Sequence, residues 1–364
     1  MRRIGLAMLF FFLCFVSTGW RQAQAQTKSR IIEFDAPGAQ ATIPEQNTLS
    51  GLIVGFSIDS SGAAHGFVRS PDGKFATIDA PGADMGAGNG TFANGITDVG
   101  TTVGSYIDAN GVAHGFVRSP DGQFMTFDAP GAGTTPNQGQ GTFPGSINSA
   151  GAISGSYVDV GGVSHGFVRS PDGTITSFDP PGSANTFANT LGIDPAGAIS
   201  VPYLDENNVL HGAVRAPDGT ITNFDAPGEG AGSGQGTSPQ SISPTGTIPG
   251  LVIDSNNVAH AFLRSPDGTF TTFDVSGAGT GPGQGTQALA TNLPGTTTGQ
   301  FIDSNGTNHG FLRTPGGKFF FFDPPDAGTG PGEGTIPLSI SLSGVVTGLY
   351  LDSNGAAHGF VRFP

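Results

Sequence analysis

All seven histidines of the chain stand at the start of the same short sequence, His-Gly-Phe-Val-Arg-Ser-Pro-Asp-Gly or a close variant. In six copies an aspartate follows after the next short apolar stretch, as Asp79 follows His65. An imidazole beside a carboxylate can act as a catalytic base or can be a structural, hydrogen-bonded pair. The sevenfold repetition favours the structural role, because an enzyme needs one site.

The turn between each histidine and its aspartate predicts how the two residues meet. If Ser70-Pro71-Asp72-Gly73 is a type I turn with Gly73 as a one-residue bulge, the flanking strands place His65 opposite Asp79. The same count applies to every copy. We predict seven structural pairs: His65–Asp79, His114–Asp128, His165–Asp179, His211–Asp225, His260–Asp274, His309–Asp323 and His358–Asp35. An alternative stays open, in which each aspartate only caps the Ala-Pro-Gly turn after it.

A second group of acidic residues resembles metal ligands. Asp108, Asp303 and Asp352 open the sequence Asp-x-Asn-Gly, as in a calcium loop. Calcium takes about six to eight oxygen ligands, and no acidic residue closes a loop of about twelve residues here. We expect hairpin turns and no metal, and keep the three aspartates as weak calcium candidates.

Enzyme signatures are otherwise absent from the sequence. There is no Gly-x-Ser-x-Gly, His-Glu-x-x-His or phosphate-loop sequence. Four acidic residues outside the repeat have no histidine partner of their own: Asp98, Asp194, Glu229 and Glu333. We predict no catalytic residue and no cofactor, and the ligand-binding residues stay unknown.

The histidine sequences recur about every 49 residues, a period typical of four-stranded propeller blades. One period contains four predicted strands with turn residues between them, at about 142–148, 152–158, 163–169 and 174–179. All four tyrosines share one position of the second strand, which we interpret as packing between repeats. The arginine that ends each third strand, such as Arg69, is expected to meet a neighbouring repeat or solvent.

The two ends of the repeat region complement each other. Residues 31–35 match a fourth strand with no third strand before it, and residues 358–362 match a third strand with no fourth strand after it. Pairing these two segments would complete the seventh repeat and close a ring. We therefore predict an all-β, seven-bladed β-propeller of four-stranded blades over residues 26–364, rather than an open solenoid.

Composition agrees with an ordered all-β chain. The 364 residues include 61 Gly and 27 Pro, which oppose long helices, and 28 Phe, which supply core material. The formal net charge is −14, and most acidic residues occupy repeat positions. The fourth-strand aspartates, the second turns and the Gly-rich loops such as 275–286 should share one acidic face. Such a face argues against nucleic acid and against anionic membranes as partners.

Residues 1–25 have the layout of a cleavable secretory signal. Arg2 and Arg3 precede an apolar run from Ile4 to Val16, and cleavage is expected near Ala25. The only cysteine and the only tryptophan lie in this segment, so the mature chain would have no disulfide. We expect secretion to the extracellular space or periplasm, with no membrane span in the mature chain.

The recurring His-Gly-Phe sequence, with His260-Ala261-Phe262 as one variant, resembles the HAF-type extracellular repeat of secreted bacterial proteins. The resemblance covers essentially all of the mature chain and implies a propeller-like repeat fold and a location. It implies no reaction and transfers no catalytic residue. The fourth copy departs from the pattern at Pro202 and Ala213, and the sixth at Gly316.

These observations favour a secreted, non-catalytic binding or scaffold propeller, expected to be a monomer. Its Gly-rich loops would face an extracellular protein or glycan. The alternative is a polysaccharide-acting hydrolase or lyase in the central depression, where carboxylates from different blades could form a pair.

Overall fold

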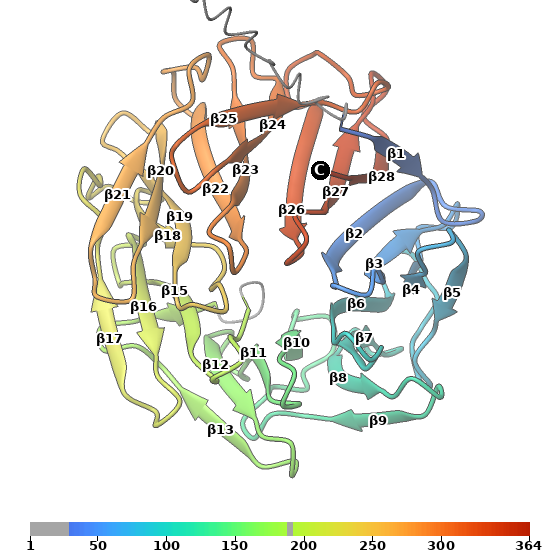
Figure 1. Ribbon diagram of the computed structural model, residues 1–364. Coiled ribbons are helices and arrows are strands. Elements are labelled where there is room, and N and C mark those ends of the chain that lie inside the picture. The colour runs from blue at the N-terminus through green and yellow to red at the C-terminus, as the bar shows by residue number, and fades with distance from the viewer. Residues whose placement is uncertain (1–28, 188–191) are drawn as a thin grey trace, which may run out of the picture.

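The computed structural model describes residues 29–187 and 192–364, so the predicted signal, residues 1–25, lies outside the described residues. The described part contains 28 β-strands and no helix, and hence no helix that could cross a membrane. The strands form repeated units of four, which we call the first to seventh units; Figure 1 shows them following one another around a common centre.

The strands of each unit are named here by their order within it. The first strands are β2 (Ala41–Asn47), β6 (Gly90–Ile96), β10 (Gly141–Ile147), β14 (Asn185–Thr186), β18 (Gly236–Pro239), β22 (Gly285–Thr291) and β26 (Gly334–Ile340). The second strands are β3 (Ile53–Ile58), β7 (Thr102–Ile107), β11 (Ile153–Val158), β15 (Ile199–Leu204), β19 (Ile248–Ile253), β23 (Thr297–Ile302) and β27 (Val346–Leu351). The third strands are β4 (Ala64–Arg69), β8 (Ala113–Arg118), β12 (Ser164–Arg169), β16 (Leu210–Arg215), β20 (Ala259–Arg264), β24 (Asn308–Arg313) and β28 (Ala357–Arg362). The fourth strands are β5 (Phe75–Ile78), β9 (Phe124–Phe127), β13 (Ile175–Phe178), β17 (Ile221–Phe224), β21 (Phe270–Phe273), β25 (Phe319–Phe322) and, for the seventh unit, β1 (Ile31–Phe34).

Turn chemistry sets the antiparallel register within a unit. In the last turn of the first unit, Gly73 has φ of 87° and its N–H donates to the Ser70 carbonyl at 2.9 Å. Beyond this turn Arg69 pairs with Phe75 and Gly66 with Ile78, which is the register predicted from the bulge. The strand bounds predicted for residues 142–179 agree with β10 to β13 to within one residue.

Glycine permits adjacent units to approach closely. The first strand of most units starts at a glycine that bridges the third strand of the preceding unit, as Gly90 bridges Ala64. Gly90 has φ of 121°, and a Cβ there would lie 2.0 Å from the Ala64 carbonyl oxygen. A side chain at this position would therefore push the two units apart.

Phenylalanine fills the space between units. One phenylalanine of the third strand is at most 2% exposed in six units: Phe67, Phe116, Phe167, Phe262, Phe311 and Phe360. In the fourth unit Ala213 takes this position and is also buried. Each fully buried phenylalanine contributes about 2–3 kcal/mol, so this layer is the main stabilising contact between units.

The repeated arginine completes the contact between units. Its guanidinium lies over a phenylalanine of the preceding unit's fourth strand at 4.6–5.2 Å in six cases: Arg69–Phe34, Arg169–Phe127, Arg215–Phe178, Arg264–Phe224, Arg313–Phe273 and Arg362–Phe322. Arg118 lies over Phe124 of its own unit, because the preceding unit has Ile78 at the phenylalanine position. From the sequence, the arginine was expected to meet a neighbouring repeat or solvent. The structure adds its cation–π contact with phenylalanine.

The two ends of the described chain meet. β1 pairs antiparallel with β28, from Ile31 opposite Arg362 to Phe34 opposite Gly359. The Asn47 side chain of the first unit donates to the Val345 carbonyl of the seventh at 2.9 Å. The ladders as a whole divide into one sheet of 16 strands and one of 12. Thus the pairing of residues 31–35 with 358–362 exists, and the first unit contacts the seventh.

We expect Phe34→Ala to lower the free energy of unfolding by about 3 kcal/mol, because its ring packs on Gly359 and under Arg69. Urea unfolding of the variant measures this loss. Phe321→Ala is the matched control: Phe321 is 53% exposed and should cost less than about 1 kcal/mol. Equal losses in the two variants would contradict a special role for β1.

Candidate functional site

The structure brings together all seven histidine–aspartate pairs expected from the sequence. In each, histidine Nδ1 lies 2.8–3.0 Å from the nearer carboxylate oxygen: His65–Asp79, His114–Asp128, His165–Asp179, His211–Asp225, His260–Asp274, His309–Asp323 and His358–Asp35. The last pair joins the two ends of the described chain. The aspartates do not cap the following turn in the way the alternative supposed: in five units that turn donates its N–H to a threonine, as Ala80 does to Thr91 at 2.9 Å.

Each histidine has a second acidic neighbour that the sequence analysis missed. Nε2 lies 3.4–3.8 Å from an aspartate of the turn between the second and third strands: Asp59, Asp108, Asp159, Asp205, Asp254, Asp303 and Asp352. The constant spacing of this aspartate before each histidine was the available signal. Burial alone would lower the pKa of His165, but Asp179 and Asp159 together raise it above its ordinary value.

An aromatic ring covers the histidine in five units. Ring centroids are 4.9–5.2 Å apart in the stacked pairs Tyr106–His114, Tyr157–His165, Tyr203–His211, Phe301–His309 and Tyr350–His358. The sequence suggested only that the tyrosines pack between units. In the structure they also cover the histidines. Ser57 in the first unit and Val252 in the fifth replace the aromatic residue.

The weak calcium candidates use their carboxylates inside the turn. Asp352 Oδ1 accepts the N–H groups of Asn354 and Ala356 at 2.8 and 2.9 Å. The hydrogen bond from Ala356, followed by those from Asn354, holds the pKa of Asp352 below its ordinary value. Asp108 and Asp303 accept equivalent bonds. The local hairpin explains these aspartates, as the turn interpretation expected.

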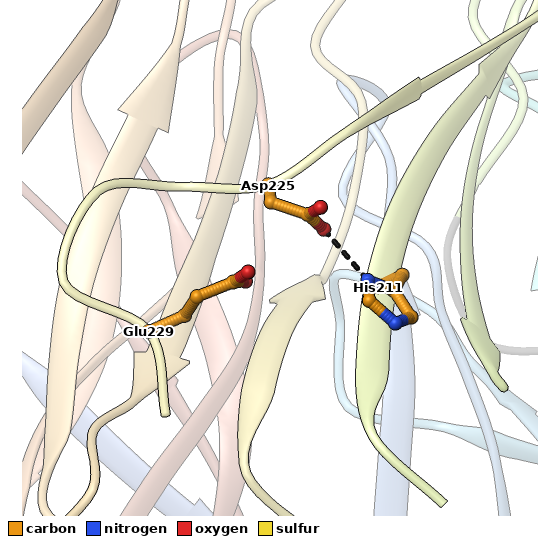
Figure 2. Close-up of side chains that lie close together, drawn as sticks. All are labelled: His211, Asp225 and Glu229. Atoms are coloured by element: carbon orange, nitrogen blue, oxygen red, sulfur yellow. Dashed lines mark hydrogen bonds and ion pairs between the residues drawn. The ribbon is translucent and has the colours of Figure 1, made fainter. Parts of the chain in front are cut away.

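Glu229 corrects the interpretation that the acids outside the repeat are isolated. Its carboxylate lies near His211 and Asp225, with potential ligand atoms of the three within 4.8 Å of one another (Figure 2). Glu229 stands where several other loops have alanine, which is why the repeat pattern hid it. Thr237 donates to Glu229 at 2.6 Å, and burial raises the pKa of Glu229. The group offers three ligands to a cation, but His211 Nδ1 is already bonded to Asp225.

A pocket of about 340 Å³ opens beside His260 in the fifth unit. Its walls come from the fourth-unit loop (Pro227 and Gly228), from Val252 and Asp254, and from Thr272 to Asp274. Val252 is smaller than the tyrosine of other units, and the His260 side chain is 35% exposed, compared with 20% for His211 under Tyr203. The His260 imidazole is thus the most exposed of the seven, and it lies between the Asp254 and Asp274 carboxylates. The sequence analysis interpreted the tyrosine position, which Val252 occupies here, only as packing between repeats.

A larger cavity of about 780 Å³ lies along the central axis. First strands and the turns after them line it, including Glu45, Asp98 and Asp194. Protein atoms crowd the Glu45 carboxyl although it is partly accessible along the axis, and this desolvation raises its pKa from 4.5 to about 7. Asp98 accepts the Leu49 N–H and Asp194 the Ala198 N–H, each at 2.8 Å. The sequence named Asp98 and Asp194 but missed Glu45, because its effect depends on the surrounding units.

Comparison with known proteins identifies a fold and no family. No family model and no curated protein matches the chain. A puromycin hydrolase structure has a TM-score of 0.55 at 13% identity, over 89% of this chain and 55% of the hydrolase. BP39L lectin from Burkholderia pseudomallei also has 0.55, at 14% identity over 89% of this chain and 95% of the lectin. A prolyl endopeptidase structure gives 0.53 at 11% identity, over 89% of this chain and 50% of the peptidase.

The chain spans about half the length of the hydrolase and the peptidase and nearly all of the lectin. At these identities the likeness concerns the fold alone, which the chain shares with the hydrolase, the lectin and the peptidase.

We expect a thermodynamic cycle of Asp35→Ala, His358→Ala and the double variant to be less than additive by about 0.5–1 kcal/mol, because the pair is partly exposed. Each single variant should lower stability by about 1 kcal/mol. Urea unfolding near pH 6 measures all four proteins. Full additivity would show that the His358–Asp35 pair does not stabilise the folded protein.

We also expect Glu45→Gln to change how stability depends on pH. Because the folded-state pKa lies above the ordinary value of 4.5, the folded protein holds a proton that the unfolded chain has released. Wild-type stability should therefore fall as pH rises from about 4.5 to 7, by up to about 3 kcal/mol. Denaturant unfolding between these pH values should give a flatter profile for Glu45→Gln, and coincident profiles would contradict the prediction.

Proposed function

We propose that this protein is a secreted, non-catalytic binding propeller that recognises an extracellular glycan in the pocket beside His260. The observation that carries the proposal is the partly exposed imidazole of the fifth unit between two carboxylates, beside a pocket and without the tyrosine that covers the histidine in four other units. A peptide or protein partner is the other occupant that such a loop face could accept.

The pocket has the mixed chemistry that a sugar ring needs. Asp254, Asp274 and the His260 ring supply hydrogen-bond groups for hydroxyls at one side. Pro227 and Phe273 supply apolar surface for the C–H groups of the ring. A few directed polar groups against an apolar wall favour a small, uncharged polyol over a purely apolar ligand.

Charge restricts the saccharide class. The Val258 N–H holds the pKa of Asp254 below its ordinary value, so this carboxylate is ionised at neutral pH. The pocket would therefore repel uronates and sulfated sugars, and we propose a neutral saccharide. The same charges support the absence of nucleic acid and of anionic membrane among its partners.

The loop face is built to present this pocket. Gly-rich loops between units bond to the neighbouring turns, as Gly283 donates to the Asn257 carbonyl at 2.7 Å. Gln284 Oε1 also accepts the Gly281 N–H at 2.9 Å, which holds the loop on itself. Such loops form a pre-organised surface, which lowers the entropic cost of binding.

We further propose that the mature chain, residues 26–364, is a single closed ring of seven blades and a monomer of the HAF-type repeat family. The pairing of β1 with β28, the Asn47–Val345 hydrogen bond and the Arg69–Phe34 contact support ring closure. Secretion, with cleavage near Ala25, rests on the sequence of residues 1–25.

The second candidate function is a hydrolase or lyase in the central depression, with Glu45 as the acid–base residue. A carboxyl with a pKa of about 7 is suited to acid–base chemistry. Glycoside cleavage needs a second carboxylate, whereas Asp98 accepts an N–H from the turn of the first unit and Asp194 accepts one from its own turn. The geometry supports binding better than catalysis.

We expect Val252→Tyr to weaken saccharide binding by at least about tenfold, because tyrosine at this position would cover His260 as Tyr203 covers His211. A glycan array of the wild type identifies the ligand, and calorimetry measures its affinity for both proteins. The folded stability should be unchanged, since other units already accommodate tyrosine here.

Val99→Tyr is the matched control, because Val99 is 75% exposed and lies in a turn of the second unit, whereas the pocket is in the fifth unit. It should bind the saccharide as the wild type does. Unchanged affinity in Val252→Tyr would rule out this pocket, and an array with no neutral glycan bound would rule out the function.

A further inference from the structure

The axial cavity differs from the rest of the molecule in its charge composition. The residues that line it include three ionisable side chains, Glu45, Asp98 and Asp194, and no lysine, arginine or histidine. Elsewhere each repeat couples two of its carboxylates to a histidine, as at His165. The cavity is thus an acidic space without a built-in cation.

Among the described residues, Glu45 is the carboxylate of this cavity that has no partner. It is the extra residue of the bulge between Pro44 and Gln46 in β2, which directs the chain towards the axis. The next side chain, Gln46, accepts the Ile96 N–H at 3.0 Å, and Asn94 of the second unit donates to Pro144 at 2.8 Å. Within the described residues no hydrogen bond or ion pair reaches the Glu45 carboxyl, so it is free to receive a ligand.

Apolar residues hold five of the seven equivalent turn positions around the cavity, and Asp98 and Ser149 hold the other two. Leu49, Leu293 and Leu342 occupy equivalent turn positions around it and are 55%, 50% and 40% exposed. Pro195 and Pro244 hold two further turn positions. Exposed leucines grouped around a cavity favour contact with an apolar body rather than with water alone.

We propose that the axial cavity binds a primary amine carried on an apolar body, with the ammonium group against Glu45 and the apolar part between the mouth leucines. The unpartnered carboxylate supplies the charge complement, and Asp98 and Asp194 add a field of the same sign. Anionic ligands are disfavoured by all three groups. This site is separate from the saccharide pocket on the loop face and does not depend on it.

Binding of the amine should depend on the ionisation of Glu45. An alkylammonium keeps its proton until a pH of about 10, as lysine does, so its charge is constant over the neutral range. Glu45 is protonated at about pH 5.5 and ionised at about pH 8.5, since its pKa is about 7. Affinity should therefore rise with pH, whereas Asp98 and Asp194, the other ionisable groups of the cavity, offer no site of their own because backbone N–H groups hold their carboxylates.

Calorimetry with three ligands of equal length tests the proposal: hexylammonium, hexanol and hexanoate. We expect hexylammonium to bind one per chain at about pH 8.5, at least about tenfold more tightly than hexanol, and hexanoate not to bind. Affinity for hexylammonium should fall by about tenfold or more at about pH 5.5. Equal affinity for hexylammonium and hexanol, or no binding of either, would overturn the proposal.

Glu45→Gln should reduce hexylammonium binding to the level of hexanol and abolish its pH dependence. Glu333→Gln is the matched control, because Glu333 lies in a loop position where three other units have Gln140, Gln235 and Gln284. The control removes the same charge and should bind hexylammonium normally. Circular dichroism checks that both variants fold. If Glu45→Gln does not fold, the pH dependence of hexylammonium binding to the wild type tests the site.

Two cross-measurements distinguish the axial site from the saccharide pocket of the proposed function. The variant should bind the glycan with wild-type affinity, and Val252→Tyr should bind hexylammonium with wild-type affinity. Unchanged hexylammonium binding in Glu45→Gln would show that Glu45 is not the counter-ion and would overturn the proposal.

Discussion

A four-stranded unit of this protein cannot bury its own faces, and each unit therefore depends on its neighbours for a core. The third-strand phenylalanines, such as Phe167, are buried only because the fourth strand of one unit lies against the next. This constraint makes the unit-to-unit contact the main source of stability, at about 2–3 kcal/mol for each ring. The arginine above each contact adds at most about 1–2 kcal/mol. The seventh unit faces the same requirement, and β1 supplies its missing strand.

The histidine–aspartate chemistry is best understood within this packing. Each imidazole bridges a fourth strand and a turn of its own unit, and an aromatic ring usually covers it. The arrangement holds polar groups at the loop face without leaving an unpaired histidine. Seven copies of one arrangement cannot by themselves select a ligand, so selectivity has to come from positions where the copies differ.

The three departures from the repeat that matter most are Val252, Glu45 and Glu229. Val252 removes a ring and opens a pocket; Glu45 places a carboxyl where other first strands have uncharged residues; and Glu229 adds a carboxyl to an existing pair. All three alter a site without altering the strands. A rigid repeat scaffold tolerates such substitutions because the strand register is set by turns and glycines elsewhere.

Much of the fold could be predicted from the sequence, because its determinants are local. Turn residues such as Pro71 and Gly73 set the register, which puts His65 opposite Asp79, and the incomplete repeats at the two ends put residues 31–35 beside 358–362. The second aspartate at each histidine, the arginine over phenylalanine, and the pockets at Val252 and Glu45 could not be predicted in the same way. The second aspartate depends on how a turn of the same unit lies against the histidine, and the other features depend on distances between different units and on burial. A periodic sequence specifies which residues recur but not how closely neighbouring copies pack. The repeat in the sequence therefore determined the strands and their partners, whereas the tertiary structure decided how closely the units pack and which side chains their packing buries or leaves exposed.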